Sequence, residues 1–125
     1  MSLDLDPGYP PARVDRAVRH AQAGDHVRAE QELKRVLGDE PYFAKAHFNY
    51  GAFLLERGNP SAALIRFKRA SELDRGYLRA YHGAVLCQVS LGQSKEAQAT
   101  LAALEAIAPG SEEAELARRV VEDHR

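Results

Sequence analysis

The chain of 125 residues has no tryptophan, one methionine and one cysteine, Cys87. A lone cysteine cannot form a disulfide within the chain, which fits a reducing compartment. No apolar run approaches the roughly 20 residues that a membrane-spanning helix needs, and the first ten residues lack the basic start and apolar core of a secretory signal. The sequence therefore indicates neither a membrane span nor secretion, and we expect a cytoplasmic protein.

An excess of charge of one sign is also missing, since 17 Lys and Arg residues stand against 18 Asp and Glu residues. Binding to nucleic acid or to an anionic membrane usually leaves a basic footprint, so neither partner is expected. Arg outnumbers Lys thirteen to four, a bias typical of GC-rich bacterial genomes. With 45% hydrophobic residues, the chain fits one domain that buries roughly two thirds of its unfolded surface.

Signatures of catalysis and of metal binding are absent as well. The five histidines form neither a His-x3-His pair nor an H-E-x-x-H motif, and there is no G-x-S-x-G, P-loop or G-x-G-x-x-G sequence. Asp4 and Asp6 could suggest a metal pair, but carboxylates beside loops are nearly always solvated. No His or helix N-terminus is placed to lower the pKa of the Cys87 thiol, which favours an inert packed thiol over a nucleophile. We expect no enzyme activity, no cofactor and no metal.

What the sequence does contain is a period of 34 residues. LDPGYP at 5–10 returns as LDRGYL at 73–78, twice that period later. The same spacing separates three glycines and two series of apolar residues: Gly24, Gly58 and Gly92; Ala29, Ala63 and Ala97; Leu33, Phe67 and Leu101. Because the second apolar series follows the first by four positions, both lie on one helical face. Such a period predicts a stack of repeated helical units.

One period, residues 44–77, has the pattern of two helices joined by a turn at residues 57–59. Pro60 suits the first position of the second helix, where its missing N–H would be unpaired anyway. In the first helix the residues His47, Tyr50, Gly51 and Leu54 follow the spacing i, i+3, i+4, i+7 and share one face. The unit is therefore predicted to be a helical hairpin.

This pattern resembles the tetratricopeptide repeat, whose signature is W-x2-L-G-x2-Y, then Ala-x3-Phe, and finally Pro within 34 residues. The middle unit departs from it at His47, where the family has Trp, and at Arg75, where it has Pro. We interpret His47 as a partly buried packing histidine rather than a pH switch. The resemblance covers about four fifths of the chain and implies an all-α fold, a right-handed α-solenoid of three helix-turn-helix hairpins plus one capping helix.

The expected organisation is a single structural domain. Ser111 looks like an N-cap before an acidic first turn, and the outer positions of the helix that follows are polar, which suits a capping helix. Residues 3–10 resemble the end of a preceding repeat, and either a longer array or a native start signal would explain them. The units are an N-terminal extension at 1–9, repeats at 10–43, 44–77 and 78–111, and the capping helix at 111–125.

The first helix of the first repeat breaks the pattern. Its apolar residues, among them Val14 and Val18, fall one place later than the family's core positions, which hold Arg13, Arg16 and His20. Either this helix is rotated or the turn after it is one residue short. We favour a core position for both Val14 and Val18.

The resemblance also implies a ligand site, because the first helices of stacked repeats line a concave groove in this family. Carried over to the two well-matched repeats, the groove positions include an apolar strip of Phe48, Leu55, Leu86 and Val89. The candidate peptide-binding residues are Lys45, Phe48, Asn49, Ala52, Leu55, Arg79, His82, Leu86 and Val89. The prediction is a groove that binds a peptide or an amphipathic helix of a partner protein.

Some members of the family grip the carboxylate end of acidic chaperone tails with five polar residues. Asn49 and Arg79 match two of these positions, whereas Val14, Val18 and Gly83 do not, so this clamp is not expected here. The leading hypothesis is a non-enzymatic adaptor or chaperone-like module, similar in architecture to three-repeat chaperones of bacterial secretion systems. The alternatives are a docking or regulatory domain of a larger enzyme and a self-assembling homo-oligomer.

Overall fold

The computed structural model of the chain describes residues 9–124, which form seven α-helices and no strand. The predicted all-α class is therefore confirmed. The expectations for residues 1–8, including the end of a preceding repeat and the Asp4–Asp6 metal pair, lie outside the described residues. The helices are α1 (Pro10–Gln22), α2 (His26–Asp39), α3 (Ala44–Glu56), α4 (Pro60–Leu73), α5 (Leu78–Ser90), α6 (Ser94–Ile107) and α7 (Glu112–Asp123).

Three hairpins repeat with the period seen in the sequence. Their first helices begin at Pro10, Ala44 and Leu78, so successive starts are 34 residues apart. Within each hairpin the chain reverses at a glycine with positive φ, which is 86° at Gly24, 80° at Gly58 and 74° at Gly92. A side chain is disfavoured in this left-handed region, so glycine is what allows these short turns.

Helix starts follow the local sequence. The side chain of Asn59 accepts a hydrogen bond from the backbone N–H of Ala62, and Pro60 occupies the first turn of α4, as predicted. Asp25 caps α2 in the same way by accepting from the N–H of Arg28. These caps fix where the second helix of each of the first two hairpins begins.

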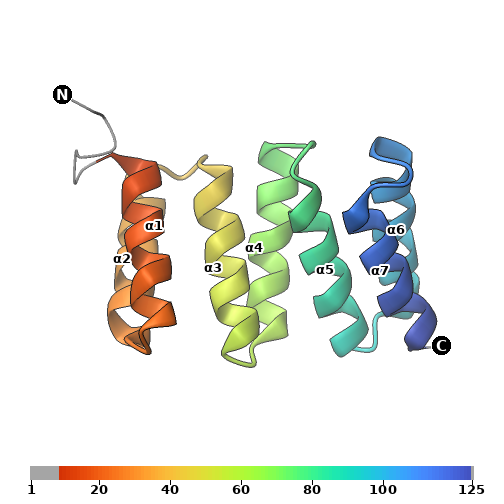
Figure 1. Cartoon of the computed structure of the whole chain (residues 1–125), viewed down its shortest axis with the longest axis horizontal. Coiled ribbons are helices and arrows are strands. Elements are labelled where there is room, and N and C mark those ends of the chain that lie inside the picture. Colours follow the sequence, from red (N-terminus) through yellow and green to blue (C-terminus); the bar gives the residue numbers. More distant parts are fainter. Residues whose placement is uncertain (1–8, 125) are drawn as a thin grey trace.

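The hairpins lie side by side along the long axis of the molecule, from α1 and α2 at one end to α6 and α7 at the other (Figure 1). Successive first helices contact one another, α1 with α3 and α3 with α5, and α7 then packs against α5. The α1, α3 and α5 helices therefore share one face of the solenoid, and α7 continues it.

The centre of the core is Phe67 of α4, which is 2% exposed. Its ring lies against two glycines, since a Cβ added at Gly51 would lie 2.9 Å from the ring and one added at Gly83 would lie 2.7 Å from it. The absence of these side chains lets α3 and α5 approach α4 closely. The family-pattern residues of α3, which are His47, Tyr50, Gly51 and Leu54, are all buried, as their spacing predicted.

The last helix has the features of a cap. The Ser111 hydroxyl accepts a hydrogen bond from the N–H of Ala114, and Glu112 and Glu113 stand in the first turn of α7. Ala114, Ala117 and Val121 are buried against α5 and α6, whereas the outer positions Glu115, Arg118, Arg119 and Glu122 are exposed. The predicted polar outer face of this helix is confirmed.

The first hairpin keeps the register of the other two. Helix α1 and its turn have the same length and phase as α3 and α5, so the turn is not one residue short. Val14 is fully buried against Val36 and Ala46. Val18 is only half-buried and lines a cavity, so the expectation that it lies in the core is corrected.

Two of the three polar residues at the family's core positions in α1, Arg13 and Arg16, form ion pairs with α2. The Arg16 guanidinium lies 2.9 Å from the Glu32 carboxylate, and the Arg13 guanidinium lies 3.5 Å from Glu32 and 2.8 Å from Asp39. Burial alone would raise the pKa of Glu32, but hydrogen bonds from Arg16 and Arg13 outweigh it and lower the pKa. Ion pairs thus satisfy Arg13 and Arg16 at the positions that His47 and Tyr50 occupy in the second hairpin.

Candidate functional site: a cavity between α1, α3 and α5

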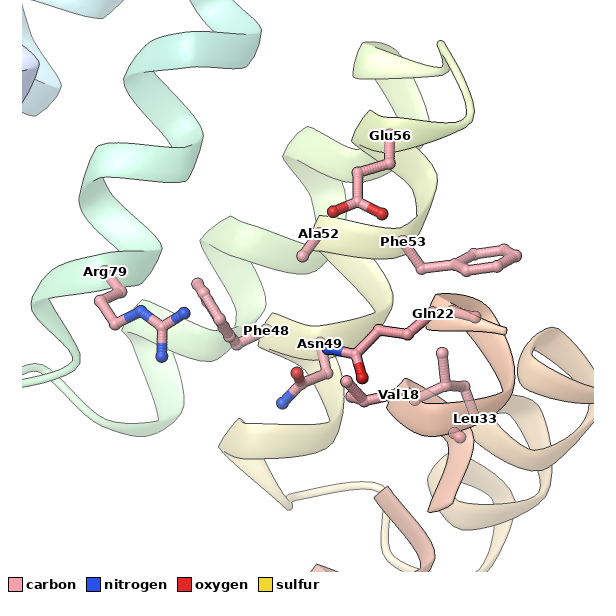
Figure 2. A pocket seen from close by; sticks show the side chains of 11 residues that line it. Val18, Gln22, Leu33, Phe48, Asn49, Ala52, Phe53, Glu56 and Arg79 are labelled. Carbon is pink, nitrogen blue, oxygen red and sulfur yellow. The ribbon is translucent and has the colours of Figure 1, made fainter. Parts of the chain in front are cut away.

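A cavity of about 220 Å³ opens on the face shared by α1, α3 and α5 (Figure 2). Its apolar lining is mostly small on the α1 and α3 sides, where Val18, Ala21 and Ala52 lie, and Leu33 of α2 also contributes. The full lining, which we call the α1–α3–α5 cavity, is Ala17, Val18, Ala21, Gln22, Leu33, Phe48, Asn49, Ala52, Phe53, Glu56 and Arg79. It has the mixed character of a ligand site, apolar with a few polar groups at its edges.

Phe48 is a wall of this cavity rather than an exposed anchor. The side chain is 6% exposed, and its ring stacks on Tyr77 at 5.0 Å and tilts against Phe67 at 5.6 Å between centroids. The Arg79 guanidinium lies 4.6 Å from the Phe48 ring centre on the cavity side. The expectation of an exposed Phe48 in an apolar strip is therefore corrected, because Tyr77, in the segment between α4 and α5, covers it.

Two of the predicted polar residues have partners within the chain. Lys45 of α3 forms an ion pair of 3.1 Å with Asp15 of α1, which ties the first two hairpins together. The Asn49 side-chain amide donates a hydrogen bond of 2.8 Å to the Lys45 carbonyl, one turn earlier. Asn49 lies in the middle of the cavity, whereas Lys45 is not part of its lining.

Two charged residues of the cavity have no ion-pair partner among residues 9–124. They are Arg79, which reaches across from α5 over Phe48, and Glu56, which stands at the C-terminal end of α3 (Figure 2). Both side chains are exposed. The cavity therefore carries an unneutralised positive charge toward one end and an unneutralised negative charge toward the other.

The remaining predicted residues lie on α3 and α5, outside the cavity. Leu55, His82, Leu86 and Val89 are half-buried, and none of them lines the α1–α3–α5 cavity. Val89 instead lines a separate cavity of about 310 Å³ between α5, α6 and α7, together with Val121 and His124. Burial raises the energy of the charged form of His82 and lowers its pKa.

Sequence reasoning missed the contribution of α1. The period of 34 residues relates Val18, Ala21 and Gln22 to Ala52, Leu55 and Glu56. It could therefore have identified these α1 residues as part of the cavity. The equivalence was not used because polar residues occupy the family's core positions in α1, which suggested that this helix is rotated. Phe53, which is 8% exposed, was missed as well, and no signal in the family pattern marks its position.

Two residues with potential chemistry have structural environments. The Nε2–H of His47 donates to the Pro41 carbonyl at 2.8 Å and its Nδ1 accepts from Arg66 at 3.4 Å, while burial lowers its pKa. Cys87 is fully buried, and burial raises the pKa of its thiol to about 11. Both observations agree with the predicted packing roles, because the two ring nitrogens of His47 are engaged in hydrogen bonds and the Cys87 thiol is buried and protonated.

The described residues contain neither a cluster of metal ligands nor a helix that could span a membrane. Over residues 9–124, no three His, Cys, Asp or Glu side chains gather where they could hold a metal ion. In that range, too, each helix is too short or too polar to cross a membrane.

The geometry defines a class of protein, an all-α solenoid of helical hairpins with a cavity on the face that the first helices of the hairpins share. The family model described as "Tetratricopeptide repeat" matches residues 20–82 and 54–119, so the chain belongs to the tetratricopeptide repeat family. A sequence search of curated proteins found no significant match.

Solved structures with the same fold include two TPR domains and a secretion chaperone. The second TPR domain of human RPAP3, in complex with the HSP70 peptide SGPTIEEVD, matches with a TM-score of 0.78 at 20% identity. The match covers 90% of this chain and 98% of the RPAP3 chain. The Arabidopsis OM64 TPR domain has a TM-score of 0.80 at 18% identity, over 93% and 96% of the two chains. The Yersinia enterocolitica type III secretion chaperone SycD, in complex with a peptide of the translocator YopD, has a TM-score of 0.76 at 17% identity, over 90% and 86%.

Proposed function

We propose that the protein is a non-enzymatic adaptor or chaperone-like scaffold that binds a peptide segment of a partner protein in the α1–α3–α5 cavity. The observation that carries this proposal is the cavity itself, which combines small apolar side chains with two charged groups that have no ion-pair partner within residues 9–124. Small residues such as Ala21 and Ala52 leave room for a side chain of a ligand. The peptide complexes of human RPAP3 and of SycD support the proposal by analogy of fold.

The predicted site residues divide into two groups under this proposal. Phe48, Asn49, Ala52 and Arg79 surround the ligand directly, because they line the cavity. Lys45 acts through Asp15, by holding α1 at its place beside α3. Leu55, His82, Leu86 and Val89 extend the same face and would contact a ligand longer than the cavity.

The wider setting follows from the composition. We infer a bacterial protein of the cytoplasm, from the lone cysteine and the excess of Arg over Lys. The balanced charge favours a protein partner over nucleic acid or a membrane, and a second copy of the chain remains an alternative occupant of the groove. We take residues 10–43, 44–77 and 78–111 as the three repeats and 111–125 as the cap.

The test uses a variant that fills the cavity from a half-buried position of α3. Ala52 is half-buried at its centre, so Ala52→Glu places both bulk and charge there, whereas Ala102→Glu makes the same change at an exposed position on α6. Circular dichroism should show equal helicity in both variants. We expect a partner to be captured from cell extract by the wild type and by Ala102→Glu, but not by Ala52→Glu.

Overlapping synthetic peptides of that partner then locate the bound segment. One of them should bind the wild type and shift the NMR signals of the α1, α3 and α5 residues that line the cavity. Equal capture by all three proteins, or shifts confined to α2, α4 and α6, would place binding on another face and overturn the proposal.

A further inference from the structure

The α1–α3–α5 cavity is electrically asymmetric along α3. Arg79 lies over Phe48, near the N-terminal end of α3, and Glu56 is the last residue of the same helix. Figure 2 shows the two charged groups on opposite sides of Ala52. Of the other charged groups nearby, Lys45 is paired with Asp15. A bound peptide would therefore meet a cation at one end and an anion at the other.

The size of the cavity fixes what lies between the two charges. Cavities of about 150 Å³ are known to hold a benzene ring, so a cavity of about 220 Å³ has room for one large apolar side chain. It does not offer the row of anchor sites, one per helical turn, that a docked amphipathic helix uses. One anchor and two flanking charges are what the site can recognise.

The separation along α3 between Phe48, over which Arg79 lies, and Glu56 matches an extended ligand. Positions 48 and 56 lie about 12 Å apart along α3 at the α-helical rise of 1.5 Å per residue. An extended peptide covers the same length in about four residues, at roughly 3.3 Å each. In such a strand the side chains at i, i+2 and i+4 point to one face, so an acid, an apolar anchor and a base can all face the cavity together.

Resting on the proposed function, we propose that the cavity selects an extended segment with an acidic residue, a large apolar residue and a basic residue at alternate positions. The acidic side chain pairs with Arg79, the apolar one enters between Val18 and Ala52, and the basic one pairs with Glu56. The acidic residue lies at the Phe48 end of α3 and the basic residue at the Glu56 end. The peptide can run in either direction along α3, so either residue can come first in its sequence.

The experiment measures the affinity of three synthetic peptides for three proteins by fluorescence anisotropy. The peptides share a central leucine and carry Asp and Lys, two Lys, or two Asp at the positions two residues to either side. The proteins are the wild type, Arg79→Glu and Glu56→Lys. Both substituted side chains are exposed, so the variants should fold normally, which circular dichroism checks.

The preferred peptide should change with the protein. The wild type should bind the mixed peptide most tightly, Arg79→Glu the peptide with two Lys, and Glu56→Lys the peptide with two Asp. Each matched peptide should exceed a mismatched one by about fivefold, the scale of exposed ion pairs. The preference should shrink in 0.5 M salt, because screening weakens such pairs.

The outcomes separate this inference from the proposed function. Binding that needs the leucine and is lost in Ala52→Glu, yet shows no change of charge preference among the three proteins, overturns the inference and leaves the function standing. Binding that persists when serine replaces the leucine contradicts both. No binding of the three peptides to the wild type overturns the inference alone, since the proposed function is tested by the peptides of the captured partner. Equal affinity for a helical peptide with the charges eight residues apart would overturn the extended geometry.

Discussion

At the scale of single residues, His47 is a polar group held neutral by its surroundings. Its Nδ1 accepts from Arg66, so a proton on that nitrogen would break the contact and bring two cations together. Burial, the largest cause, lowers the pKa of His47 from 6.5, and the charges of Arg66 and Arg69 lower it further. The hydrogen bond to Pro41 opposes these effects without cancelling them.

The lowered pKa makes stability depend on pH. In the unfolded chain His47 takes up a proton near pH 6.5, whereas in the folded protein it does so only at lower pH. The contribution of neutral His47 to the free energy of unfolding is therefore complete above pH 6.5 and decreases as the pH falls below that value. His82, whose pKa burial also lowers, acts in the same direction. Urea denaturation at pH 7.5 and pH 5.5 should show a lower midpoint at the lower pH. In His47→Gln the difference should shrink, and an unchanged difference would contradict this account.

Gln88 is a residue whose burial costs stability. It is 2% exposed, and its Oε1 atom has no hydrogen-bond partner within residues 9–124. The residue stands 34 positions after Leu54, where the second repeat has an apolar side chain. An unsatisfied buried polar group costs about 1–3 kcal/mol, and a leucine of similar size removes that cost.

Gln88→Leu should therefore raise the free energy of unfolding by about 1 kcal/mol or more. The matched control is Gln31→Leu at an exposed position of α2, which should change it by less than about 0.5 kcal/mol. Urea denaturation at pH 7.5 measures both. A loss of stability in Gln88→Leu would mean that the amide is satisfied in solution, for example by a buried water.

At the scale of helices, the distance between α3, α4 and α5 is set by glycines. Gly83 of α5 faces Phe67, whose ring is enclosed by core residues and cannot move aside. A methyl group there would overpack the site, which costs about 1–3 kcal/mol. Gly38 of α2 is also helical but has nothing within 4 Å of its added Cβ.

The same Gly→Ala change should therefore have opposite signs at the two positions. Gly83→Ala should lower the free energy of unfolding by about 1–3 kcal/mol. Gly38→Ala should raise it by about 0.5 kcal/mol, because alanine restricts the unfolded chain and favours the helix. Thermal and urea denaturation of the two variants provide the measurement. Equal effects would show that helix propensity, rather than contact with Phe67, determines both.

The helices could be predicted from the sequence because their signals are local. Turn glycines, the Asn59 cap and Pro60 act within a few residues, and the period of 34 repeats them in phase. The cavity depends on contacts that are distant in sequence. Phe48 is covered by Tyr77, and the register of α1 is stabilised by Glu32 and Asp39 of α2. No pattern along the chain shows which charged residues neutralise one another, so Val18 was wrongly placed in the core.

At the scale of the whole molecule, both ends of the solenoid have apolar clusters, and ion pairs are more numerous at the first hairpin. The α6 and α7 helices share an apolar cluster with α5 that includes Val85, Leu101 and Leu104. The first hairpin joins the central cluster through Ala17, Ala29 and Leu33, and Val14 of α1 adds a smaller cluster with Val36 and Ala46. The first hairpin relies in addition on the ion pairs of Arg13 and Arg16, and Lys45–Asp15 ties it to the second hairpin.

In a repeat array each unit contacts only its neighbours, so the units can open separately. We expect amide hydrogen exchange to be faster in α1 and α2 than in α4 and α5, measured by mass spectrometry at neutral pH. Glu32→Gln removes the carboxylate shared by Arg13 and Arg16 and should cost about 1.5–3 kcal/mol. The faster exchange it causes should stay within residues 10–39 and spare α5, α6 and α7.

The matched control is Glu72→Gln, which breaks an exposed pair with Arg69 within α4. An exposed pair three residues apart contributes little, so exchange should change by less than about twofold throughout. Exchange that rises uniformly over all helices in Glu32→Gln would show that the array unfolds as one cooperative unit. In that case the ion pairs of the first hairpin would stabilise the whole solenoid, and a ligand bound between α1 and α3 would protect α6 and α7 as strongly as α1.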